Sequence, residues 1–231
     1  KKGKAGAVPP PPEEEKAVEE AAPTTATAQE GTDGSTGASF KPYMRAWYFQ
    51  EDAPELLDDF PDPPPYFPDK FKMVAPQFQP PFTWLFLGPK GAFSPLHRDI
   101  WMTCAWMAQV EGRKRFVFFP PKDTSCCYLK SEGGQEAYAD LRRPNLEAFP
   151  NLYSGHPVEA VLHPSDVVYI PSGWTHYVEC LTDSVSLTSN FATPKNFKRV
   201  LVPYTRWLEK RRLAAHMVSV AKDAVLRYRE G

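Results

Sequence analysis

Two short segments of the chain contain the residue types of a metal site: GAFSPLHRDIW at 91–101 and HPSDVVYIPSGWTH at 163–176. The first contains His97 and Asp99, and the second ends in His176. Two imidazoles and one carboxylate are the ligand set of non-haem Fe(II) oxygenases, which leave three coordination positions of the metal open. The three side chains therefore predict an iron centre with room for O₂ and a bidentate co-substrate.

The spacing of the three residues limits the elements that can bring them together. His97 and Asp99 stand two positions apart, so on a β-strand both side chains would point to the same face. His176 follows 77 residues after Asp99, and a β-barrel returns a distant strand alongside the first. The HxD pattern alone is common by chance. The run DVVYIP at 166–171, expected as a buried strand, and the Pro-Ser-Gly turn at 171–173 strengthen the prediction.

Compact apolar runs between residues 82 and 192 indicate the elements that would position these residues. They are rich in β-branched and aromatic residues and mostly end at Gly or Pro, which predicts many short strands in a sandwich or barrel. The polar, irregular region 122–157 predicts a segment that leaves this core and returns to it. The runs are FTWLFLG (82–88), MTCAWMAQVEG (102–112), KRFVFFPP (114–121), EAVLH (159–163), DVVYIP (166–171), HYVEC (176–180) and SVSLTSNFA (184–192), with a shorter strand expected in MRAWYFQ (44–50).

Composition divides the chain into three parts. Residues 1–39 are rich in Pro, Ala, Glu, Thr and Gly, so they predict a disordered low-complexity tail. Residues 40–193 predict one catalytic domain. Residues 194–231 show apolar residues at three- and four-residue spacing, which predicts a helical extension that breaks or begins near Pro203. Its apolar stripe favours core packing or a homodimer through these C-terminal helices.

Charge and hydropathy narrow the classes of partner. The formal net charge is −1, which gives no electrostatic reason to expect nucleic acid. No apolar run approaches 18 residues, so we expect no membrane span. The four cysteines form no CxxC pair and predict reduced, mostly buried thiols rather than a zinc site. We expect a reducing location, nuclear and/or cytoplasmic.

A dicarboxylate co-substrate would make a second demand on the sequence. Its distal carboxylate needs a cation and a hydroxyl, because an unpaired buried charge is very costly. Lys114 begins the run KRFVFFPP, and Thr188 lies in SVSLTSNF. Taken alone, Lys114 fits better as a strand-end lysine that faces solvent beside Arg113 and Arg115.

Together these segments resemble the Jumonji C family. The likeness spans FTWLFLGPKGAFSPLHRDIWMTCAWMAQVEGRKRFVFFPP and HPSDVVYIPSGWTHYVECLTDSVSLTSNF, covers roughly residues 43–197, and is strongest to the small protein-hydroxylase branch that includes the bifunctional arginine demethylase and lysyl hydroxylase. The resemblance implies a mainly β double-stranded β-helix, or cupin jelly roll, with flanking helices. It also implies Fe(II), 2-oxoglutarate as co-substrate, and O₂.

The resemblance assigns roles to individual residues. His97, Asp99 and His176 match the iron ligands and would be catalytic. Lys114 and Thr188 match the residues that hold the distal carboxylate of 2-oxoglutarate. The remaining cofactor-binding matches are Tyr48, expected to reach the same carboxylate, Ser94 near the co-substrate, and Asn190 near the metal. Met107 stands where close relatives often have Asn, which is a departure from the family pattern.

The first function that this resemblance implies is hydroxylation of a side chain in a protein or peptide substrate. The alternative is demethylation of N-methyl lysine or arginine in histones or other proteins, which uses the same chemistry. The acidic residues of the loop 51–62 would suit a basic peptide, or form a solvated loop. A catalytically silent scaffold would show degraded metal positions, and a zinc hydrolase would need a general base that the sequence does not offer.

Overall fold

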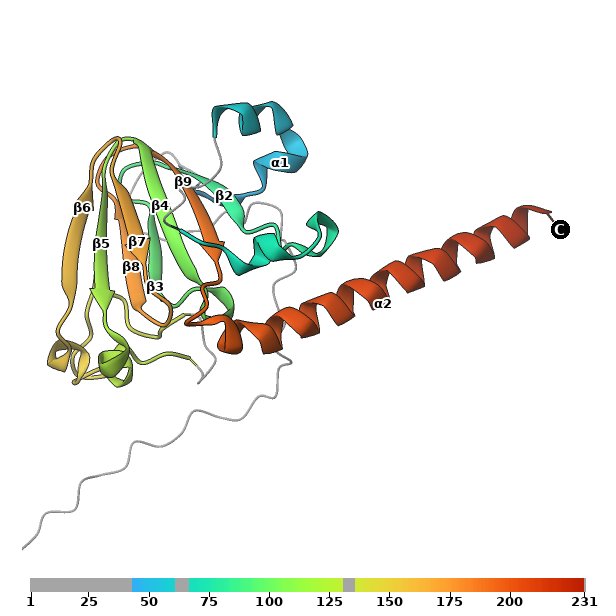
Figure 1. Ribbon diagram of the computed structural model, residues 1–231. Coiled ribbons are helices and arrows are strands. Elements are labelled where there is room, and N and C mark those ends of the chain that lie inside the picture. Colours follow the sequence, from blue (N-terminus) through green and yellow to red (C-terminus); the bar gives the residue numbers. More distant parts are fainter. Residues whose placement is uncertain (1–42, 61–66, 131–135, 231) are drawn as a thin grey trace, which may run out of the picture.

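The computed structural model describes residues 43–60, 67–130 and 136–230, and for residues 220–230 it describes the backbone alone. Within these ranges the chain forms two antiparallel sheets that face each other (Figure 1). The first sheet has the strand order β1 (Met44–Trp47), β2 (Thr83–Gly88), β9 (Ser184–Phe191), β4 (Cys104–Glu111) and β7 (Val167–Ile170). The second has the order β3 (Phe93–His97), β8 (Thr175–Cys180), β5 (Lys114–Phe119) and β6 (Val158–Leu162).

The connections between the sheets are those of a jelly roll. From β2 to β5 and again from β6 to β9, each strand lies in the sheet opposite its predecessor. Strands distant in the chain therefore become neighbours, and β3 pairs with β8. The prediction of a mainly β double-stranded β-helix is confirmed, and its short strands follow from the β-branched and aromatic runs in the sequence.

Side chains alternate between the inside and the outside of the barrel. On β4, Ala105 and Met107 face a core between the two sheets, whereas Trp106 packs on the outer face of the first sheet. On β8, Val178 lies in the inner core and Tyr177 in an outer cluster under the second sheet. The period of two residues thus places alternate positions toward the interior, where the candidate site lies.

Short helices close the barrel. The α-helix α1 (Phe49–Asp52) follows β1, and the long helix α2 (Phe197–Glu230) follows β9. The 3-10 helices are η1 (Pro54–Asp59), η2 (Lys70–Met73), η3 (Pro76–Phe78), η4 (Ile100–Met102), η5 (Pro121–Cys127) and η6 (Leu152–Ser154). As expected, the segment between β5 and β6 leaves the barrel and returns, and the four cysteines are free.

Helix α2 runs through Pro203, so the expected break or helix start at this residue is wrong. Proline removes one backbone hydrogen bond from a helix interior. Here contacts on both sides of Pro203 compensate, because Val200 before it and Tyr204 after it are buried in the same aromatic cluster. Beyond Leu208 the helix projects away from the sheets, and its described side chains are exposed (Figure 1).

Strand β7 is an edge strand and not the buried strand that we expected from DVVYIP. It pairs with β4 on one side only, and Val167 and Tyr169 are 46% and 45% exposed. An apolar run shows that a strand contacts apolar neighbours, but its place in the sheet is set by the topology. The ring of Tyr169 stacks on Phe67 at a centroid distance of 6.0 Å, which explains part of its apolar setting.

Among the residues that the structure describes, no helix combines the length and the apolarity that crossing a bilayer requires. The tail predicted at 1–39 lies outside the described ranges. The division into a tail, a catalytic domain and an extension stays a prediction, as does a homodimer through α2.

Candidate metal centre

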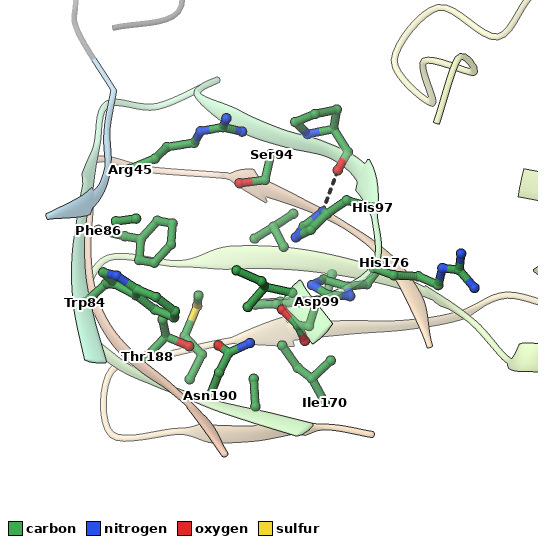
Figure 2. A pocket seen from close by; sticks show the side chains of 18 of the residues that line it. Arg45, Trp84, Phe86, Ser94, His97, Asp99, Ile170, His176, Thr188 and Asn190 are labelled. Atoms are coloured by element: carbon green, nitrogen blue, oxygen red, sulfur yellow. Dashed lines mark hydrogen bonds between the residues drawn. The ribbon is translucent and has the colours of Figure 1, made fainter. Parts of the chain in front are cut away.

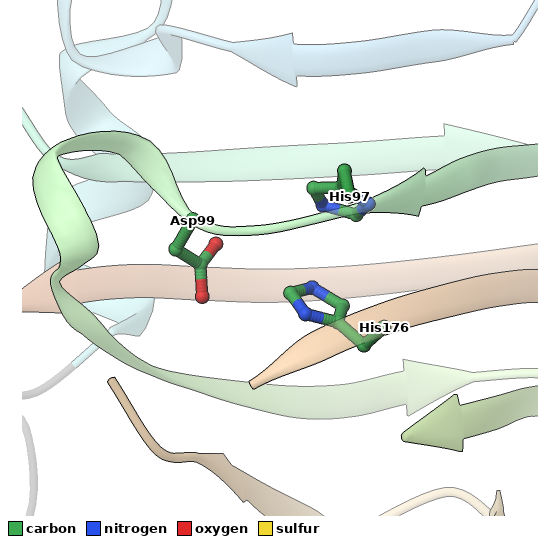
Figure 3. Close-up of side chains that lie close together, drawn as sticks. All are labelled: His97, Asp99 and His176. Carbon is green, nitrogen blue, oxygen red and sulfur yellow. The ribbon is translucent and has the colours of Figure 1, made fainter. Parts of the chain in front are cut away.

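The three predicted ligands come together inside the barrel, at the end where β3 and β8 meet (Figure 3). One ligand atom from each of His97, Asp99 and His176 lies within 4.8 Å of the others. His97 and His176 are direct partners in the antiparallel register of β3 and β8. Their rings lie 4.2 Å apart between centroids. The pairing of β3 with β8 thus brings together two histidines that are far apart in the sequence, as the barrel prediction requires.

Backbone carbonyls orient both imidazoles. The Nδ1 of His97 lies 2.7 Å from the Pro95 carbonyl oxygen, and the Nδ1 of His176 lies 3.3 Å from the Trp174 carbonyl oxygen. Since a carbonyl oxygen only accepts, each Nδ1 carries the hydrogen and each Nε2 keeps its lone pair for a metal. Burial, followed for His97 by its neighbour His176, lowers the pKa of each imidazole to about 4. Both rings are therefore neutral at pH 7, which is the state that binds metal.

Asp99 is not on the strand with His97, as we had expected. Strand β3 ends at His97, and Asp99 is the extended residue just before η4. Residues Trp101 and Met102 of η4 have φ angles of 54° and 59°, in the left-handed region that few non-glycine residues adopt. The carbonyl of Met102 accepts hydrogen bonds from the Ser172 hydroxyl at 2.6 Å and the Asn196 amide at 3.0 Å. These bonds fix the turn that carries the carboxylate.

The carboxylate of Asp99 fits a divalent cation. Its Oδ2 is buried and, among the described residues, has no hydrogen-bond partner. Burial raises the pKa of Asp99, whereas His97 and Asn190 lower it. A buried carboxylate oxygen without a partner costs free energy that a bound cation would offset. Two neutral imidazoles and this carboxylate are the donor set for Fe(II), so the residues present fit the group that the sequence predicts.

A cavity of about 320 Å³ leads from these residues into the barrel (Figure 2). Its walls are mostly apolar, with Met107, Phe116, Ile170 and Val178 among the lining residues. Ligand cavities of this size and composition hold small molecules, and a few polar groups set the orientation. The polar lining residues are therefore the ones that decide what enters.

Lys114 lies behind this cavity and is fully buried, so the solvent-facing alternative is excluded. Its Nζ has no hydrogen-bond partner among the described residues and lies 5.2 Å from the ring centroid of Phe86. Burial lowers the pKa of Lys114 to about 8. A buried ammonium group without an anion is strongly disfavoured, so this position is suited to a carboxylate that arrives with a ligand.

The tyrosine beside Lys114 is Tyr43, which our sequence reasoning missed. The Lys114 Nζ lies 5.9 Å from the Tyr43 ring centroid, and Tyr43 is 7% exposed. Tyr48 also lines the cavity, but its ring packs edge-on against Trp84 at 5.7 Å. A bulge in β1, where Ala46 has a φ of 55°, breaks the alternation of inside and outside positions. Arg45, another residue not foreseen, also lines the cavity.

The other predicted co-substrate residues line the same cavity. The Thr188 hydroxyl donates to the Trp106 carbonyl at 2.7 Å, and the Asn190 amide donates to the Thr103 hydroxyl at 2.8 Å. Ser94 lies on β3, opposite Val178 of β8. Met107 is 5% exposed and lines the wall without offering a polar group. The structure thus brings the predicted residues to one cavity, while their individual roles stay predictions.

A comparison with protein families matches residues 10–197 to the model described as "Cupin-like domain". The chain belongs to this family. Over 155 residues, 64% of this chain, it is 32% identical to "Lysine-specific demethylase JMJ21" of Arabidopsis thaliana. It is also 32% identical over 159 residues, 66% of this chain, to "Arginine-specific demethylase JMJ22" of the same organism. A third relative is "2-oxoglutarate and iron-dependent oxygenase JMJD4" of Gallus gallus, 34% identical over 119 residues, 50% of this chain.

The cupin-like match and these relatives confirm the resemblance to the Jumonji C family. The aligned part of the chain corresponds to 16%, 31% and 27% of the lengths of the three relatives, respectively. The chain therefore spans less than a third of each of these curated proteins. The family match over residues 10–197 contains the three predicted metal ligands, His97, Asp99 and His176.

Proposed function

We propose that the chain is the catalytic domain of an Fe(II)- and 2-oxoglutarate-dependent oxygenase, an oxidoreductase that hydroxylates a side chain of a protein substrate. One observation carries the proposal. His97, Asp99 and His176 converge at one end of an apolar cavity, and the ammonium group of Lys114 is buried behind that cavity with no hydrogen-bond partner in the described part of the chain. A metal at one end and a cation near the other are the two attachments that a 2-oxo dicarboxylic acid needs.

His97, Asp99 and His176 would hold the iron on one side and leave its remaining positions open. Bound iron and 2-oxoglutarate together supply the chemistry: they activate O₂ to oxidise a C–H bond, while 2-oxoglutarate becomes succinate and CO₂. Lys114 would pair with the distal carboxylate, and the Thr188 hydroxyl lines the same cavity. The protein contributes position and charge, as is general for enzymes whose cofactors carry the reaction.

The cavity walls would keep water away from the reacting carbon. Met107, Phe116, Ile170 and Val178 present apolar groups around the site, and Phe116 is fully buried. The carbonyls of Pro95 and Trp174 hold the two imidazoles in the tautomer that binds metal. The two imidazoles would therefore be oriented before a metal enters.

The relatives favour a protein as the substrate, and they leave two reactions open. One relative is named an iron-dependent oxygenase and two are named demethylases. Hydroxylation and N-demethylation begin with the same oxidation of a C–H bond and differ in which carbon is presented. We propose hydroxylation first, because the cationic side chains of Arg45 and Arg98 line the cavity and disfavour a methylated cation.

The test is turnover by the purified chain. With Fe(II), ascorbate and O₂, we expect 2-oxoglutarate to be converted to succinate, and Asp99→Ala to abolish the conversion. The matched control is Asp58→Ala, since Asp58 is an exposed residue of η1 outside the site. Mass spectrometry of candidate proteins then distinguishes gain of one oxygen atom from loss of a methyl group. No succinate from a well-folded native chain that has bound iron would contradict the proposal.

A further inference from the structure

Arg45 is a charged residue of the cavity that the proposed chemistry does not use. It lies on β1 two residues after Tyr43, and both line the cavity. Figure 2 shows its guanidinium group reaching over the site toward Ser94 of β3. Strands β1 and β3 are each an edge strand of their sheet, so Arg45 stands at an edge of the first sheet.

No carboxylate pairs with Arg45 among the residues that the structure describes. The carboxylates that line the cavity are those of Asp99 and Glu136. Asp99 is the proposed metal ligand, and Glu136 forms an ion pair with Lys130 at 3.0 Å. Arg45 nevertheless lines the same cavity as His97 and Tyr43, so its charge acts within the site. A guanidinium group in this position is a donor for a group that comes from outside.

The co-substrate has other partners for its charges. An Fe(II) ion would balance Asp99 and one carboxylate of 2-oxoglutarate, and Lys114 would balance the other. Figure 2 places Thr188 on the other side of the Phe86 ring from Arg45. With iron and co-substrate bound, the positive charge of Arg45 is still available to pair with a group of the protein substrate. Guanidinium groups form strong paired hydrogen bonds with carboxylates.

We propose that Arg45 selects the protein substrate by charge: it pairs with an acidic side chain near the oxidised residue and disfavours a lysine or arginine there. The inference rests on the proposed function, and it favours hydroxylation over demethylation of a methylated cation. A methyl-lysine or methyl-arginine would bring a further positive charge into a cavity that Arg45 and Arg98 already line. Like charges in a partly desolvated cavity repel one another.

Binding of peptide pools tests this inference without catalysis. Three fluorescein-labelled pools consist of peptides of uncharged residues, and each pool has one fixed central residue: Asp, Asn or Lys. Fluorescence anisotropy measures the affinity of each pool for the full chain loaded with Mn(II) and 2-oxoglutarate. We expect the Asp pool to bind best and the Lys pool worst. Arg45→Gln should lower the affinity for the Asp pool by about tenfold or more, the range for a hydrogen bond to a charged group. Arg45→Lys should retain part of the preference for the Asp pool over the Lys pool.

Arg113→Gln is the matched control, since Arg113 is exposed at the turn between β4 and β5. Equal binding of the three pools, or tighter binding of the Lys pool, would overturn the inference. So would an Arg45→Gln variant whose affinity for 2-oxoglutarate falls as much as its affinity for the Asp pool, since Arg45 would then hold the co-substrate. Failure of the native chain to bind Mn(II) or 2-oxoglutarate would instead contradict the proposed function.

Discussion

His97 and His176 are direct partners across the antiparallel strands β3 and β8, with their ring centroids 4.2 Å apart and their planes inclined by 53°. The register of this pair fixes two of the three proposed metal ligands. A slip by one residue would send one of the rings to the outer face of the barrel. The site therefore depends on the fold as a whole, although its ligands come from short segments.

The buried ammonium group of Lys114 should be required for the co-substrate and not for the metal. We expect Lys114→Met to weaken 2-oxoglutarate binding by at least about 100-fold, because breaking a buried ion pair costs about 3–5 kcal/mol. Iron affinity should change by less than about threefold, a difference below 1 kcal/mol. Titration calorimetry under anaerobic conditions measures both affinities. Equal losses in both would mean that Lys114 has a structural role.

The same variant makes a prediction about stability. Without 2-oxoglutarate, Lys114 is a buried group with no hydrogen-bond partner for its Nζ among the described residues. A methionine of similar length would fill the space without the cost of desolvating a charge. The free energy of unfolding of Lys114→Met should therefore be no lower than that of the native chain, and higher by as much as about 1–2 kcal/mol. Urea unfolding measures it, and a loss of stability would show that Lys114 is well paired.

Binding of 2-oxoglutarate should weaken at alkaline pH. Burial lowers the pKa of Lys114 to about 8, and a bound carboxylate stabilises the charged form and raises this pKa in the complex. The affinity should be constant below about pH 8 and then fall, by up to about tenfold per pH unit, as the free lysine loses its proton. Calorimetry with Mn(II) in place of iron measures this slope.

The groups that face Lys114 do not titrate in the same pH range as this lysine. Tyr43 approaches it from the position just before β1, Cys180 approaches it from β8, and Phe86 of β2 does not titrate. Burial raises the pKa of both Tyr43 and Cys180 above their ordinary values, so both stay neutral near pH 8. The control is Lys114→Met, whose weak binding should not vary between pH 7 and 9. A slope that persists in this variant would assign the titration to another group.

Tyr43, and not Tyr48, should contact the distal carboxylate of 2-oxoglutarate. Tyr43 flanks Lys114, whereas Tyr48 packs against Trp84. Tyr43→Phe should weaken 2-oxoglutarate binding by about tenfold, the value of a hydrogen bond to a charged group. Tyr48→Phe is the matched control and should bind 2-oxoglutarate like the native chain. The reverse result would restore the role that the family resemblance gives to Tyr48.

The sequence predicts most of the strands, and it predicts the three side chains that the fold brings together, since both depend on residue type. The β-branched and aromatic runs at 82–88, 102–112 and 184–192 contain β2, β4 and β9. The missed features depend on backbone geometry. Asp99 follows β3 instead of lying on it, because the strand ends at His97 and a turn with left-handed residues begins.

The roles of the tyrosines show the same limit. The resemblance gives the carboxylate contact to Tyr48, but Ala46 adopts a positive φ and the register of β1 against β2 shifts between Met44 and Trp47. A single sequence does not reveal such a bulge. The placement of Arg45 in the cavity follows from the same strand, so a residue that looks like an ordinary surface arginine in the sequence becomes a candidate for substrate selection.

The most direct test of the central claim is anaerobic titration calorimetry of Fe(II), followed by 2-oxoglutarate, with the native chain, Asp99→Ala and Asp58→Ala. We predict that the native chain and Asp58→Ala bind one Fe(II) and then one 2-oxoglutarate per chain, with co-substrate binding much tighter once iron is present. The affinity of Asp99→Ala for iron should be lower by about 100-fold or more, since one of the three ligands is gone. Native-like iron binding by Asp99→Ala would contradict the account.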